Sequence, residues 1–422
     1  MNHVKQIFGG NLRQFGMIGA LVVLLLGFQI ATGGKVLTSF NVQNLINGNS
    51  YVLILAIGMV LVIIAGHIDL SVGSVAAFVG ITVALSIQDW GFPWWAGVIF
   101  GLLLGAAIGA WQGFWVAVVG IPAFIVTLAG MLLFRGLNQL IGHSNSVPVP
   151  SEIQYLGGGF LPEIGPDSGF NNLTLLLGIV GLAALVFGEL YSRSQSVKIG
   201  MDVPPAWVMW VRIGLVGIVI VLVTLIFASG RAGTSFPIAG IILGVLVLVY
   251  AFISSRTIVG RHVYAVGGNK NAAELSGVKS KKVNFLVMMN MSILAAVAAI
   301  VFIGRSAASG PFDGTGWELD AIAAVFIGGA AVSGGVGTVV GSMIGGLVMA
   351  VLNNGLQLLS VGADMTQIIK GLVLLLAVAI DVYNKSQGRA SVIGLMMKNF
   401  KRNEKAGLQS ATDNVPLETS TK

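Results

Sequence analysis

The sequence has no cysteine and few charged residues. Asp, Glu, Lys and Arg make up only 9% of its 422 residues, and only four residues are histidines. Without cysteine the chain can form no disulfide, thiolate metal cluster or thiol nucleophile. An ordinary globular protein carries about 25% charged residues, so this chain has too little charge to cover a surface in contact with water. The composition therefore excludes an ordinary soluble domain.

Catalytic signatures are also missing. The nucleotide-binding pattern G-x-x-x-x-G-K-[ST] does not occur, and residues 267–270, GGNK, come closest but lack its spacing and its hydroxyl. Neither H-E-x-x-H nor G-x-S-x-G is present, and the four histidines are far apart. This leaves no support for metal or triad catalysis. We expect a protein that is not an enzyme and holds no cofactor or metal.

Long apolar runs dominate what is present. Hydrophobic residues make up 55% of the chain, and a membrane-spanning helix needs about 20 mainly apolar residues. The runs predict an all-α fold, a polytopic transmembrane helical bundle with about twelve spans, or roughly ten to twelve. The predicted spans cover residues 16–31, 48–65, 70–87, 94–119, 123–141, 172–190, 207–228, 236–253, 283–303, 318–333, 336–357 and 366–383.

Basic residues predict how the spans are oriented. If the N-terminus is cytoplasmic, most Lys and Arg residues fall on the inside, and the outer segments hold only Lys35, Arg231 and Arg305. This distribution follows the positive-inside rule. The net charge of +7 is therefore assigned to orientation, because nucleic-acid binding needs basic residues gathered on one exposed face. We expect both termini in the cytoplasm and no nucleic-acid partner.

The same pattern divides the chain into three parts. Residues 1–15 form a cytoplasmic N-terminus, residues 16–383 a transmembrane domain, and residues 384–422 a basic cytoplasmic tail that we expect to be disordered. The longest outer loop, residues 143–171, contains no Lys or Arg. Its Pro and Gly content predicts an ordered but irregular cap.

Glycine marks both breaks and close packing in the apolar runs. Spans adjoin with almost no loop around residues 67–71, 120–122 and 333–335, and two interpretations remain open. These are broken or re-entrant helices beside a translocation path, and tight turns at the membrane interface. Small residues also recur every four positions and predict close helix contacts, at Gly101, Gly105, Gly109 and Gly113 and again at Ser333, Gly337, Gly341 and Gly345.

The spans carry little charge at mid-depth. Their ionisable residues fall near predicted span ends, where snorkelling or capping explains them: Asp69, Arg135, Glu189, Arg212, Asp320, Lys370 and Asp381. An ion-driven transporter is therefore disfavoured, and a path for a neutral polar solute is favoured. Amides bond hydroxyls as donor and acceptor, and those that line such a path, or alternatively pin helices together, are Gln112, Asn138, Asn290, Asn353, Asn354 and Gln357.

The predicted inner loop at residues 254–282 is the one long polar segment between spans. Its middle, residues 271–277 (NAAELSG), is a short helix-forming stretch that ends at glycine. We expect a brief exposed helix that docks a partner on the cytoplasmic face. A solvated basic loop explains the charges of this segment but not its Gly-Gly and Ala-Ala-Glu pattern.

Three motifs connect this loop with two of the helix breaks. They are GHIDLSVGS at residues 66–74, GRHVYAVGGN at 260–269 followed by Ala272-Ala273-Glu274 and Gly277, and Gly328-Gly329 followed by SGGVGT at 333–338. With these motifs the chain resembles the permease subunits of bacterial ABC importers for simple sugars. The resembled type is that for ribose, xylose or multiple monosaccharides, within the branched-chain permease superfamily. The resemblance covers residues 40–383.

The resemblance implies a type II ABC importer-like fold and several partners. A homodimer in the inner membrane, surrounded by lipid, would receive a monosaccharide from a periplasmic binding protein. A separate cytoplasmic ATPase subunit, or a tandem ATPase, would hydrolyse ATP. The resemblance assigns the coupling to that ATPase to Gly267, Gly268, Asn269, Asn271, Ala272, Ala273, Glu274 and Gly277. Asn271 stands where a loosely comparable motif of other importers has Glu, so the match to that wider pattern is partial.

Two further expectations concern Asp69 and the cargo. Asp69, with Ser71, is expected to cap the helix after a break, with direct sugar contact as the alternative. Residues 192–205 and the span at 207–228 look inserted relative to ribose-type permeases, which favours a xylose-like or multiple-sugar cargo. A branched-chain amino acid permease of the same superfamily and a self-sufficient secondary sugar transporter remain as alternatives.

Overall fold

The computed structural model describes residues 12–386 apart from 167, 201–202, 204 and 231–232, and leaves out the side chains of residues 12–15, 377 and 380–386. The Asp381 side chain and nearly all of the expected tail at 384–422 lie outside the described residues, as does most of the segment 1–15. The chain divides into two compact units, Met1–Leu374 and Leu375–Lys422. Every contact and cavity considered below lies within the first unit.

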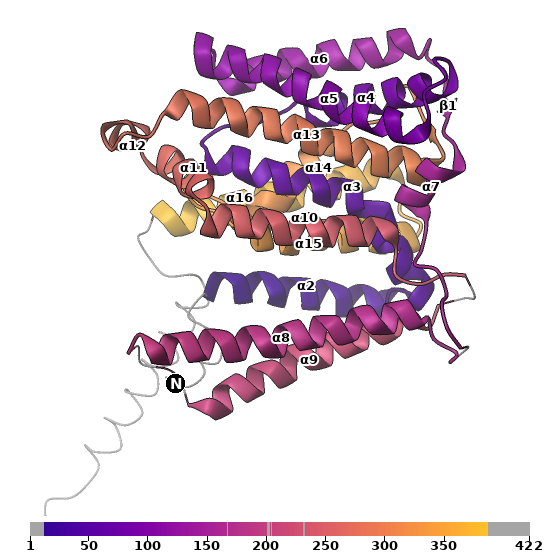
Figure 1. Cartoon of the computed structure of the whole chain (residues 1–422), viewed down its shortest axis with the longest axis vertical. Helices are drawn as coiled ribbons and strands as arrows, with labels where there is room; N and C mark the ends of the chain where they lie inside the picture. The colour runs from indigo at the N-terminus through magenta and orange to yellow at the C-terminus, as the bar shows by residue number, and fades with distance from the viewer. Residues whose placement is uncertain (1–11, 167, 201–202, 204, 231–232, 387–422) are drawn as a thin grey trace, which may run out of the picture. The chain divides into compact units, whose positions relative to one another are not determined.

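The described residues form a bundle of α-helices with one pair of short strands (Figure 1). Eight of the described helices are long and apolar enough to cross a membrane, and Gly16–Ala31 and Val72–Gln88 are shorter apolar helices. The prediction of an all-α membrane bundle is confirmed. The elements are α2 (Leu12–Ala31), α3 (Ser39–Ile64), α4 (Val72–Gln88), α5 (Trp94–Gly113), the π-helix η1 (Phe114–Val119), α6 (Ala123–Ile141), β1 (Val147–Pro148), α7 (Ser151–Gly158), α8 (Asn172–Lys198), α9 (Ala206–Ala228), α10 (Ile238–Arg256), α11 (Ile258–Gly268), α12 (Lys270–Leu275), α13 (Ser280–Ser306), β2 (Ala308–Ser309), α14 (Trp317–Ile327), α15 (Val339–Leu358) and α16 (Ala363–Ser386).

The predicted span at residues 318–333 is not one helix. Its helical part, α14, has eleven residues, which at 1.5 Å per residue reach about half of the 30 Å hydrocarbon layer. Glycines stop the helix, because Gly329, Gly334 and Gly335 adopt positive φ values of +88°, +77° and +71°. An irregular segment therefore runs from α14 to the start of α15. Of the two open interpretations, this position fits a broken helix.

The core of the bundle lies along α3 and α13. In the most apolar stretch of each helix, 78% of residues are buried in α3 and 67% in α13, against 6% in α8 and 11% in α9. α13 packs against α3, α4, α5 and α7. A helix that is apolar all round belongs in the interior of such a bundle, whereas α8 and α9 leave most of their apolar surface for lipid.

The first glycine ladder lets α5 approach α13. A Cβ on Gly105 would lie 2.7 Å from the Ser292 carbonyl oxygen, and one on Gly109 would lie 2.6 Å from the Met289 Cα. The packing role predicted for this ladder is confirmed. In the second ladder, Gly345 meets the Ala324 carbonyl of α14 in the same way, with a Cβ distance of 2.0 Å. Its residues 333 and 337, however, lie in the irregular segment before α15, so that ladder is not a single helix face.

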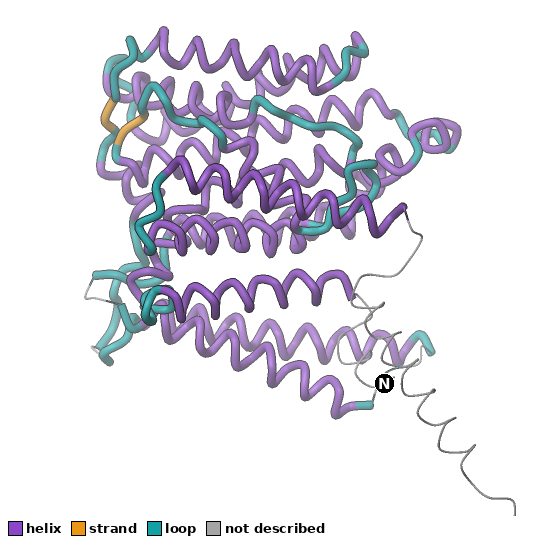
Figure 2. The backbone as a smooth tube through the Cα atoms, turned by 180° about the vertical axis from the view of Figure 1, so that it is seen from behind, coloured by secondary structure: helices purple, strands orange, loops and turns teal. Residues whose placement is uncertain are grey.

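Two outer features complete the bundle. α8 and α9 form a helical hairpin in which Arg212 and Glu189 are joined by an ion pair of 3.0 Å. At the end of the bundle opposite α12, β1 pairs antiparallel with β2 (Figure 2), and α7 packs on α13. The loop at 143–171, predicted as an ordered cap, thus contains a strand and a helix within irregular backbone.

Candidate functional site

A short helix protrudes at the end of the bundle opposite the strands (Figure 1). It is α12, which follows α11 in the segment predicted at residues 254–282. Asn269 lies between them with extended backbone, and its side-chain oxygen accepts a hydrogen bond of 3.0 Å from the Ala272 N–H, which caps α12. After α12, Gly277 adopts φ +86° and turns the chain. The prediction of a short helix ending at glycine is confirmed.

Most side chains of α12 are exposed on the surface of the bundle. Asn271 and Glu274 are exposed, Leu275 is 92% exposed, and Ala273 is buried against the bundle. The Glu274 carboxylate accepts a hydrogen bond from the Ser280 hydroxyl at the start of α13. An exposed leucine on a helix fixed at both ends has the form of an element that inserts into a groove of a partner.

Three motif segments that are far apart in sequence meet beside α12. They are the end of α3, the end of α11 and the irregular segment between α14 and α15. The Gly335 N–H donates a hydrogen bond of 2.8 Å to the Ile64 carbonyl, and the Tyr264 hydroxyl donates one of 2.6 Å to the Gly337 carbonyl. We name this meeting point the glycine junction, formed by Gly66, Gly267, Gly268, Gly334 and Gly335.

Steric contact explains why Gly267, Gly334 and Gly335 are glycine. A Cβ on Gly267 would lie 1.6 Å from the Ile64 carbonyl oxygen, and one on Gly335 would lie 2.7 Å from the Gly268 Cα. A Cβ on Gly334 would lie 2.9 Å from the Gly267 carbonyl oxygen. Gly268 itself has open space where a Cβ would stand. Backbone therefore touches backbone without intervening side chains where α11 meets the end of α3 and the segment before α15.

The helix break before α4 is fixed by Asp69. Its carboxylate, which is buried, accepts hydrogen bonds from the Ser71 N–H at 2.8 Å and the Ser71 hydroxyl at 2.6 Å. Such a turn satisfies the backbone at the start of a helix, and α4 begins at the next residue. The Gln112 side chain of α5 donates a hydrogen bond of 2.7 Å to the same hydroxyl. Asp69 and Gln112 therefore both bond Ser71 and hold the break in place.

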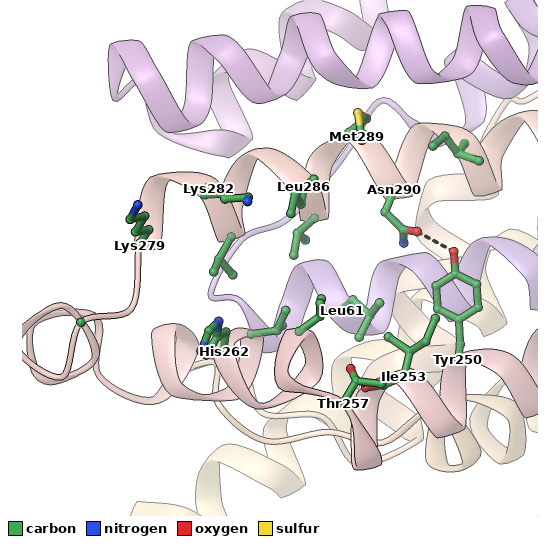
Figure 3. A pocket seen from close by; sticks show the side chains of 16 residues that line it. Leu61, Tyr250, Ile253, Thr257, His262, Lys279, Lys282, Leu286, Met289 and Asn290 are labelled. Carbon is green, nitrogen blue, oxygen red and sulfur yellow. Dashed lines mark hydrogen bonds between the residues drawn. The ribbon is translucent and has the colours of Figure 1, made fainter.

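Two cavities lie near α12. One of about 470 Å³ is lined by His67 at the break, by the η1–α6 turn and by Lys270 and Asn284. The other, of about 710 Å³, lies between α10, α11 and α13 (Figure 3). In Figure 3 the Tyr250 hydroxyl meets the Asn290 side chain at one end, and Lys279 stands at the other. Its lining is mostly apolar, so this second cavity offers few hydrogen bonds to a polar solute.

Most of the amides predicted to line a path form hydrogen bonds within the protein. Asn138 donates to the Gly310 and Pro311 carbonyls at 3.3 and 3.1 Å. Asn354 exchanges hydrogen bonds of 2.8 and 2.9 Å with Asn41 of α3. Asn353 is partly buried and Gln357 is exposed on the same helix. The structure therefore does not bring Gln112, Asn138, Asn290 and Asn354 together, and it places them where they join helices and loops.

The sequence interpretation missed a cavity of about 420 Å³ between α6, α14, α15 and α16. The Lys370 ammonium bonds both carboxylate oxygens of Asp320 at 3.0 Å, and Arg135 lies 4.0 Å from Glu318. Gln367 also lines the cavity. We name it the ionic pocket. Arg135, Asp320 and Lys370, which we expected to snorkel or cap near span ends, are in addition paired with charged residues of neighbouring helices, and Asp320 lies in the first turn of α14.

Comparisons with known proteins agree with this architecture. A family described as "Branched-chain amino acid transport system / permease component" matches residues 41–378. The chain belongs to this permease family. Among its members, the xylose transport system permease protein of Haemophilus influenzae is 38% identical over 380 residues, which are 89% of this chain and 98% of that protein. The corresponding Escherichia coli protein is 38% identical over 378 residues, which are 89% and 93%.

A second set of family members is named for another sugar. The ribose import permease protein of Escherichia coli is 34% identical over 348 residues, which are 82% of this chain and 86% of that protein. No solved structure matches the chain. Membership makes this chain a multi-pass membrane protein and a transport component, and the resemblance carried by the three glycine-containing motifs is confirmed.

Proposed function

We propose that this permease is the membrane subunit of an ATP-driven importer that carries a monosaccharide across the inner membrane. The observation that carries the proposal is α12, a capped and exposed helix whose base meets the glycine junction. A transport chain with an external docking helix and no P-loop in its sequence requires a separate motor. The cargo follows from relatives named for xylose and ribose.

A xylose-like pentose, or a set of sugars that includes one, is the cargo that we favour. The xylose proteins are matched over 98% and 93% of their length, against 86% for the ribose protein. The predicted insertion relative to ribose-type permeases, residues 192–205 with the span at 207–228, corresponds to the end of α8 and to α9 and supports the same choice.

The proposed topology has twelve crossings and both termini in the cytoplasm. α4 and α14 each complete a crossing together with the irregular segment that adjoins it, and η1 extends α5. An even number of crossings leaves the two ends on the same side, where the basic residues are concentrated. In this arrangement residues 16–383 are the permease domain and residues 384–422 a cytoplasmic tail.

The proposed partners follow from this orientation. The ATPase subunit binds α12 on the cytoplasmic side, and Asn269, Asn271 and Glu274 shape its contact. A periplasmic binding protein delivers the sugar at the end that carries α7. Two copies of the chain form a type II importer with lipid around the α8–α9 hairpins.

Reconstitution tests the function. Proteoliposomes that contain the permease, its ATPase and the sugar-loaded binding protein are expected to accumulate D-xylose only when ATP is supplied. Uptake by the permease alone would instead indicate a secondary transporter. Uptake of L-leucine without any sugar would favour the amino acid permease that the family description names, and would refute the sugar assignment.

A further inference from the structure

The ionic pocket lies between the beginning of α14 and the interior turns of α6 and α16. Lys370 is about two helical turns after the start of α16, and Arg135 is about two turns before the end of α6, roughly 10 Å from those helix ends, whereas Glu318 and Asp320 lie in the first turn of α14. Ionisable residues within membrane-spanning helices are rare and often mark a binding site or a path, because each must be compensated away from water. The pocket therefore calls for a role beyond the packing of helices.

The charges of the pocket cancel. Glu318 and Asp320 supply two carboxylates, and Arg135 and Lys370 supply two cations. A site of this composition has no net attraction for an ion, but it is dense in hydrogen-bond donors and acceptors. Its volume of about 420 Å³ falls within the range of small-molecule sites, about 300–1,000 Å³. Neutral, polyhydroxylated solutes match this combination.

The two ion pairs differ in tightness. Lys370 bonds both oxygens of Asp320 at 3.0 Å, and these side chains are 24% and 15% exposed. Arg135 is 34% exposed, and the distance between its guanidinium and the Glu318 carboxylate is 4.0 Å, too long for a hydrogen bond. Glu318 is 8% exposed, and its Oε2 has no hydrogen-bond partner among the described residues. The tight pair fixes α14 to α16, whereas in the loose pair the partly exposed Arg135 guanidinium keeps hydrogen-bond donors for a ligand.

Close packing positions the loose pair. A Cβ on Gly73 would lie 2.2 Å from the Gly314 carbonyl oxygen and 2.6 Å from Glu318 Oε2. Gly73 belongs to the motif at residues 66–74 and lies in the first turn of α4. Because it has no side chain, the segment before α14 can rest on α4 and hold the Glu318 carboxylate opposite α6. The helix break thus supports this pocket as well as the junction.

We propose that the ionic pocket is a subsite for the sugar in transit, in which Arg135 and Gln367 bond the hydroxyls of a monosaccharide. This inference rests on the proposed function and adds the residues that meet the cargo. Glu318 orients Arg135, and the Lys370–Asp320 pair keeps the site neutral. Affinity at this subsite is low, because a transported solute must leave as well as enter.

The absence of cysteine from the sequence allows a direct test. A single cysteine introduced at Thr315, an exposed residue of the pocket lining, is the only thiol in the permease and reacts with a soluble thiol reagent. The full-length permease with its ATPase is labelled in the presence of millimolar D-xylose, D-ribose, D-glucose or L-leucine. A sugar that the transporter imports is expected to slow labelling of T315C by about fivefold or more, as partial occupancy of a site requires.

Two controls separate a bound sugar from other effects. E152C, on the exposed surface of α7, is expected to be labelled at the same rate with or without sugar. In the T315C background, Q367L is expected to raise the sugar concentration for half-protection by about tenfold, the loss of one hydrogen bond. E189Q, in the ion pair of the α8–α9 hairpin, is expected to leave that concentration unchanged.

The outcomes distinguish this inference from the proposed function. If the complete transporter imports a sugar and that sugar gives no protection of T315C, the subsite is refuted and the function stands. If protection occurs equally with L-leucine, or survives Q367L unchanged, the assignment of a sugar to Arg135 and Gln367 is also refuted. If no sugar is imported at all, the proposed function fails, whatever the labelling shows.

Discussion

The glycine junction is formed by backbone contacts, whereas the ionic pocket is formed by charged side chains. At the junction a Cβ on Gly267 would lie 1.6 Å from a backbone oxygen, so the site excludes side chains altogether. The pocket depends on four charged side chains drawn from three helices. Direct backbone contact is suited to transmitting movement, because nothing between the segments can yield. Side-chain charges are suited to recognising a solute, because they offer hydrogen bonds in fixed directions.

The largest expected effect is at the junction. G267A is expected to lose more than about 3 kcal/mol of stability, because overpacking against backbone cannot be relieved by a rotamer change. The measurement is the yield of folded permease and its thermal unfolding midpoint in detergent. G268A is the matched control, since its Cβ meets nothing within 4 Å. Equal loss in both variants would show that the close contact at Gly267 is not what matters.

A smaller effect is expected when the tight pair of the pocket is broken. D320N leaves the Lys370 ammonium without its counter-charge and is expected to cost about 2 kcal/mol, less than for fully buried pairs because both side chains are partly exposed. The double variant D320N/K370Q is expected to recover part of this stability. The measurement is again thermal unfolding. A double variant less stable than either single variant would show that the two residues do not act as a pair.

The smallest effect on stability is expected at α12, where a substitution is instead expected to weaken binding of the ATPase. Leu275 is 92% exposed, so L275A is expected to leave unfolding unchanged. It is expected to weaken ATPase binding by about tenfold, as for a leucine buried in an interface. L176A, an exposed leucine of α8, is the control. Undiminished binding of the ATPase to L275A would place the docking surface elsewhere.

Local sequence patterns were sufficient for features whose cause is local. The Gly277 turn, the short helix α12 and the spacing of Gly105 and Gly109 all follow from residues near each other in the chain. The half-length of α14 did not, because apolar residues on both sides of Gly328 concealed the break. In the irregular segment that follows it, Gly329, Gly334 and Gly335 have positive φ values.

The ionic pocket was not predicted because its contacts join distant parts of the chain. Arg135 and Glu318, like Asp320 and Lys370, each look like an isolated charge beside an apolar run. Glu318 and Asp320 two residues apart, with a single lysine in the final span, were the available signal. For the amides, the sequence suggested a solute contact where the structure has a contact between helices. Asn354 suits a solute path chemically, but only the structure places Asn41 opposite it.

In the proposed importer, movement of the ATPase enters at α12 and passes through the glycine junction. The most direct measurement is the number of sugar molecules imported per ATP hydrolysed by the reconstituted transporter, for G334A against G268A. A Cβ at Gly334 would press on the Gly267 carbonyl at 2.9 Å, whereas one at Gly268 meets open space. If movement passes through the junction, G334A is expected to hydrolyse ATP but to import less sugar per ATP, while G268A matches the native ratio. An unchanged ratio in folded G334A would contradict this.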